Sequence, residues 1–90
     1  MPVRYAAPPA DAILVAELDA FTALFHRASG ITHLLVSPAP EIIGALSVEP
    51  LSLDALLAAL TRDYDLAVAD PVALAARVDE LVAAGLVSVA

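Results

Sequence analysis

Two histidines, His26 and His33, are the residues of this sequence whose type and spacing point most directly to chemistry. An imidazole can bind a metal ion or exchange a proton near neutral pH. Both flank a predicted hairpin turn. If Arg27–Gly30 is a four-residue loop, His26 pairs with Ile31 and the two imidazole rings lie on the same face of the sheet. If Ala28–Gly30 is instead a three-residue loop with a bulge, the two rings lie on opposite faces. Neither arrangement supplies a third ligand, so we predict no metal site.

The carboxylates are the second set of candidates. Asp63, Asp65 and Asp70 lack the central glycine and terminal glutamate of a calcium loop. The pairs Glu17–Asp19 and Asp79–Glu80 have no sequence neighbours that would separate their pKa values into an acid and a base. The chain also has no cysteine and no glycine-rich phosphate loop. We therefore predict a protein that is not an enzyme and uses no cofactor.

Length and charge restrict the remaining function classes. Ninety residues make one domain with a small core, and 61% of them are apolar. Eleven Asp and Glu against four basic residues leave a formal charge of −7, which repels nucleic acid and anionic membranes. No segment approaches the length of a membrane span or a signal peptide. The expected protein is soluble and cytoplasmic.

The first part of the chain has the pattern of a small sheet. Residues 1–10 are rich in proline and read as an extended arm. Within residues 11–36, three runs of β-branched and apolar residues predict strands at Ile13–Leu18, Phe21–His26 and Ile31–Val36. Gly30 can adopt the positive φ that the turn between the last two runs needs. These signals predict a three-stranded antiparallel sheet.

Residues 37–85 change to the helical period. Helices are predicted near residues 38–46, 52–63 and 71–84, with Ser37, Ser52 and Asp70 as their N-caps. Leu57 lies in the middle of the leucine stripe of the second helix and is predicted to be a core residue. Gly85 fits the left-handed position that ends the third helix, and residues 86–90 form a short apolar tail. The predicted fold class is α+β, a three-stranded sheet followed by three helices.

The third predicted strand, Ile31–Val36, carries large apolar residues on both faces. One face must cover the helices. If the strand lies at a sheet edge, its outer backbone groups invite another strand. The alternative is that the N-terminal strand or arm covers it, and the pattern does not decide between the two.

The hairpin His-Arg-Ala-Ser-Gly-Ile-Thr-His-Leu-Leu (26–35), joined to three helices that end on Asp-Glu-Leu-Val-Ala-Ala-Gly-Leu-Val (79–87), resembles the PqqD-like peptide chaperones. It is most similar to the subgroup of the HPr-rel-A system, and the likeness covers roughly residues 3 to 88. The resemblance implies a winged helix-turn-helix domain, like the recognition elements of ribosomally made, modified peptides. Such a domain is not catalytic.

The resemblance also implies a binding mode. A leader or precursor peptide is added as a strand beside the third strand and lies in the groove toward the third helix, and the domain presents it to a partner modification enzyme, here an HPr-kinase-related one. Carried over to this sequence, the peptide-binding residues are Thr32, His33, Leu34, Leu35, Val36, Leu74, Arg77, Val78 and Leu81.

Two other functions fit the same elements. A winged helix can bind nucleic acid, although the acidic charge and the single cation of the third helix, Arg77, disfavour this. The chain could also be a small interaction domain that forms homodimers. The primary expectation is a peptide-binding chaperone.

Overall fold

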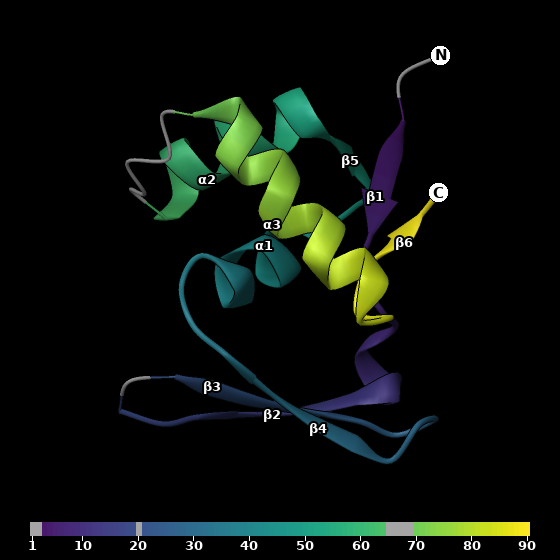
Figure 1. Cartoon of the computed structure of the whole chain (residues 1–90). Helices are drawn as coiled ribbons and strands as arrows, with labels where there is room; N and C mark the ends of the chain where they lie inside the picture. Colours follow the sequence, from purple (N-terminus) through teal and green to yellow (C-terminus); the bar gives the residue numbers. More distant parts are fainter. Residues whose placement is uncertain (1–2, 20, 65–69) are drawn as a thin grey trace.

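The computed structural model describes residues 3–19, 21–64 and 70–90. Its main sheet has the strand order β2-β3-β4 and is antiparallel, with β2 at Ile13–Glu17, β3 at Thr22–His26 and β4 at Ile31–Leu35. The helices α1 (Ala39–Leu46), α2 (Leu53–Tyr64) and α3 (Pro71–Ala83) follow and lie together on one side of this sheet (Figure 1). The predicted α+β fold, a three-stranded antiparallel sheet followed by three helices, is confirmed.

The β3–β4 turn sets the register of the sheet. His26 pairs with Ile31, so the loop is the four-residue alternative, and the N–H of Gly30 donates to the carbonyl of His26 at 2.9 Å. Gly30 has a φ of 70°, a conformation that costs a residue with a Cβ atom. Leu24 and Leu35 consequently face the helices and are buried.

A second, smaller sheet ties the N-terminal arm to the rest of the fold. In this sheet β1 (Arg4–Ala6) lies between β5 (Leu51–Ser52) and β6 (Ser88–Val89), and it is antiparallel to both. Figure 1 shows it beside the helices and away from β4. The arm and the tail are therefore paired strands, which the sequence analysis did not predict because two-residue strands have no visible alternation.

The helix boundaries follow their capping residues, with one exception. The N–H of Ala55 donates to Ser52 Oγ at 3.3 Å, and the N–H of Val72 donates to Asp70 Oδ1 at 2.9 Å, so both predicted caps are present. The predicted cap at Ser37 is wrong. The amide it would serve, that of Ala39, already donates to the carbonyl of Val36.

The core lies between the sheet and the helices. Its fully buried large side chains come from the sheet, all three helices and the C-terminal segment: Leu24, Ile42, Leu56, Leu60, Leu74, Val78 and Leu86. Leu57 is only partly buried and packs at the margin, so its prediction as a central core residue is wrong. The stripe of α2 is centred on Leu56 and Leu60 instead. Gly85, with a φ of 79°, ends α3 as predicted and turns Leu86 back into the core.

Candidate functional site

The β4 strand lies at one edge of the main sheet. It pairs with β3 on one side, and no described residue pairs with it on the other. The N-terminal arm, which the sequence left as a possible cover, pairs with β5 and β6 instead. Within the described residues, β4 therefore presents an open edge.

The hydrogen bonds of the sheet show which β4 residues face that edge. The N–H of Leu18 donates to the carbonyl of Phe21 at 2.9 Å. Hydrogen-bonded pairs alternate along antiparallel strands, so the odd-numbered residues of β3 bond to β2 and the even-numbered ones bond to β4. The odd-numbered residues of β4 then bond to β3. Thr32 and Leu34 are left with their N–H and C=O groups directed outward.

A groove of about 560 Å³ runs between the β4 edge and α3. All five residues predicted from the third strand line it, from Thr32 to Val36. From α3, Arg77 and Leu81 line it as predicted. The structure adds residues that the sequence analysis did not name: Ser37, Pro38, Ala39, Glu80, Ala84 and Leu86.

The two remaining predicted residues of α3 lie elsewhere. Leu74 and Val78 have no exposed surface and belong to the core, and neither lines the groove. The groove is instead lined by positions 77, 80, 81 and 84, which share one helix face because they are three, four and seven residues apart. That spacing was readable in the sequence. Which of two adjacent faces meets β4 depends on how the helix crosses the sheet.

Charge at the groove is balanced on the helix side. Arg77 Nη1 donates to Glu80 Oε2 at 2.9 Å and to Oε1 at 3.1 Å, and both side chains are more than half exposed. An exposed pair of this kind adds little stability. Both groups thus remain available at the rim to a ligand that carries either charge.

The histidines share one face of the sheet, as the four-residue loop requires. His33 pairs with Leu24, is half-buried and lines the groove. The His26 ring lies at the hairpin, with Nδ1 2.9 Å from Ser29 Oγ. Among the described residues no three His, Asp or Glu side chains gather as metal ligands would. The His33 ring adds a polar group to the lining of the groove.

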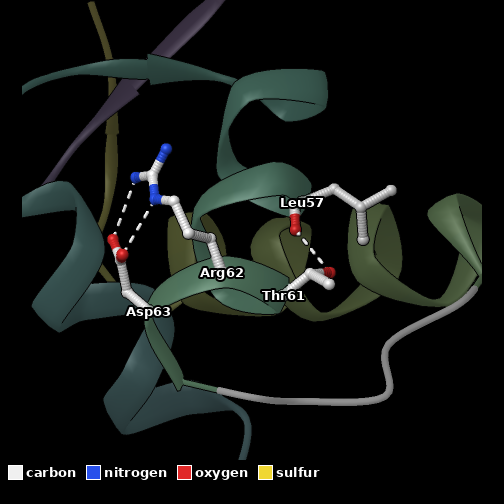
Figure 2. Close-up of polar contacts among 4 residues, drawn as sticks. All are labelled: Leu57, Thr61, Arg62 and Asp63. Atoms are coloured by element: carbon white, nitrogen blue, oxygen red, sulfur yellow. Dashed lines mark hydrogen bonds and ion pairs between the residues drawn. The ribbon is translucent and has the colours of Figure 1, made fainter.

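Two carboxylates of the sequence analysis, Asp63 and Asp70, have structural partners at the end of α2 and the start of α3. Figure 2 shows Arg62 beside Asp63, with Nε and Nη2 donating to the two carboxylate oxygens at 2.8 and 2.9 Å. These hydrogen bonds lower the pKa of Asp63, and the two side chains are exposed. Asp70 caps α3, and Asp65 lies outside the described residues. In the same view the Thr61 hydroxyl, Oγ1, donates to the carbonyl of Leu57, four residues earlier in α2.

No family model, curated protein or solved structure matches this chain. The site is therefore defined by its own geometry. None of the described helices has the length and apolar character needed to cross a membrane.

Proposed function

We propose that this protein is a non-catalytic peptide-binding domain, in which an extended peptide adds as a fourth strand beside β4 and rests in the groove against α3. The observation that carries the proposal is the outward N–H and C=O groups of Thr32 and Leu34 at the wall of that groove. Main-chain hydrogen bonds to an edge strand give affinity with little dependence on sequence, and side-chain pockets add specificity.

The groove fits alternate side chains of such a peptide. Residues of an added strand that point to the helix side would lie beside His33 and Leu35 and face Leu81 and Ala84. Small and apolar side chains suit these positions. The net charge of −7 favours a neutral or basic peptide, since long-range repulsion slows the approach of an acidic one.

The resemblance to PqqD-like chaperones supplies the wider role in this proposal. The peptide is a leader or precursor segment, and the domain presents it in the cytoplasm to a partner modification enzyme, here an HPr-kinase-related protein. Strand addition suits presentation because it fixes the direction and register of the peptide while leaving residues beyond the edge accessible.

Nucleic-acid binding is the weaker alternative. The helix that a winged domain would place in the major groove, α3, carries Arg77 as its only basic residue, and Arg77 is bonded to Glu80. Phosphate contacts supply most of the affinity for DNA. The chain offers too few cations for that role.

The proposal is tested with a peptide of about 12 residues selected on the wild-type chain from a random display library. Ala84→Glu places a charged side chain in the groove at an exposed position, so its affinity for this peptide should fall at least tenfold. Ala83→Glu is the matched control: it adds the same charge at the same helix end, but Ala83 lies outside the groove lining. Fluorescence anisotropy titrations that give the two variants equal affinity would place the peptide elsewhere.

A further inference from the structure

The β2 strand forms a second open edge of the main sheet, on the opposite side from β4. Among the described residues it pairs with β3 alone. The carbonyl of Ala12, just before β2, accepts from the N–H of Arg27, so the even-numbered residues of this strand bond to β3. Val15 and Glu17 are left with their N–H and C=O groups directed outward, where they can pair with another strand.

An apolar groove of about 410 Å³ lies between this edge and α1. The described residues that line it carry no charged side chain. Val15 pairs with Leu24, so both side chains point to the helix side of the sheet, yet Leu24 is buried and Val15 is 55% exposed. The helices therefore leave the β2 end of this face uncovered, and Pro40 and Ile43 form the opposite wall of the groove. An exposed apolar patch with a polar rim is typical of an interaction site.

An acidic hollow of about 550 Å³ continues the groove at the C-terminal end of β2. The groove and the hollow share four lining residues, Thr22, Leu35, Pro40 and Gly44. The carboxylates of the hollow are Glu17, Asp19 and Glu41, and the described residues that line it include no basic one. None of these three carboxylates forms an ion pair within the described part of the chain. Negative charge is thus concentrated at one end of an otherwise uncharged groove.

We infer that the β2 edge and its groove bind an extended, basic segment of a partner protein, which adds as a strand antiparallel to β2. Antiparallel pairing gives the more favourable hydrogen bonds. In this direction the first residues of the segment lie at the acidic hollow, where Lys or Arg side chains meet Glu17, Asp19 and Glu41. Alternate residues that follow point into the groove beside Val15 and Ile13, a position that suits small apolar side chains.

Charge and backbone together determine the class of this partner. The chain carries −7, so an acidic segment, a nucleic acid or a second copy of the chain is repelled, and a basic segment is attracted. The outward backbone groups of the edge are complementary to an extended polypeptide. The inference does not rest on the proposed function, because β2 and β4 are opposite edges of the sheet and each can be occupied while the other is.

Fluorescence anisotropy of the whole chain with a synthetic peptide, Lys-Lys-Thr-Val-Thr-Val-Thr-Val with a C-terminal fluorophore, tests the inference. Val15→Pro removes an outward N–H and places its ring where the added strand must pass, so it should weaken binding about tenfold or more. Leu34→Pro makes the same change at the other edge and should bind this peptide like the wild type. A Val15→Pro affinity no lower than that of Leu34→Pro overturns the inference, as does a wild-type chain that shows no binding up to about 1 mM.

A charge reversal tests the acidic end without a proline, so its result stands even if circular dichroism shows Val15→Pro to be unfolded. The wild type should bind the lysine peptide about tenfold more tightly than the same peptide with glutamate in place of both lysines. Glu17→Lys should narrow or reverse this preference. Glu49→Lys is the matched control, because it makes the same change at an exposed position outside the groove and the hollow. A preference that the two variants change equally contradicts the inference.

Discussion

Leu60→Ala should lower the free energy of unfolding by about 2 to 5 kcal/mol. Leu60 has no exposed surface and lies in the core that α2 shares with the sheet and the other helices. Truncation removes buried methyl groups and leaves a cavity that the neighbouring side chains fill only in part. Domains of this size have a total stability of roughly 5 to 15 kcal/mol, so one substitution would remove a large share of it.

Leu57→Ala is the matched control for this loss. It removes the same atoms from the same helix, one turn away, but from a side chain that is only partly buried. Because exposed methyl groups gain little from folding, its loss should be clearly smaller than that of Leu60→Ala. Urea unfolding followed by circular dichroism measures both. Equal losses for the two variants would mean that the α2 stripe is centred elsewhere.

Leu34→Pro should weaken binding of the selected peptide by about one order of magnitude or more while the fold is kept. The proline removes one outward N–H donor and places its ring where the added strand must pass. A lost hydrogen bond accounts for about 0.5 to 1.5 kcal/mol, and the steric conflict adds to it. Leu34 is 65% exposed and its N–H is not used in the ladder, so the sheet loses no hydrogen bond.

Two other variants define what that result means. Leu34→Ala keeps the N–H and shortens the same side chain, so it should change the affinity only a few fold. Leu35→Pro removes an inward N–H from a buried position and should destabilise the sheet itself. If Leu34→Ala weakened binding as much as Leu34→Pro, the side chain rather than the backbone would hold the peptide.

Local signals in the sequence were sufficient for most of the architecture. Ser52 and Asp70 predicted the starts of α2 and α3, and Gly30 predicted the hairpin, because a cap or a positive φ depends on a few neighbouring residues. The second sheet was missed. Its strands β5 and β6 have two residues each, and their partner β1 lies far away in the sequence, so the pairing depends on the assembled fold.

The candidate site was predictable on its strand side and only partly on its helix side. Thr32 to Val36 form one continuous run, so any edge position brings them to the groove together. On α3, Leu74, Val78 and Leu81 carry the apolar period and are buried in the core. Of these three only Leu81 also lines the groove, together with Arg77 from the neighbouring face. Neighbouring faces of one helix differ only in rotation, and the packing of α3 on the other helices sets that rotation.

Backbone hydrogen exchange at β4 tests the strand-addition proposal most directly. In the free protein the amides of Thr32 and Leu34 point to the open edge and should exchange quickly, while those of His33 and Leu35 are protected by the ladder with β3. Saturation with the selected peptide should protect Thr32 and Leu34 and leave the other two nearly unchanged. Peptide binding that leaves the exchange of Thr32 and Leu34 as fast as in the free protein would contradict strand addition at β4.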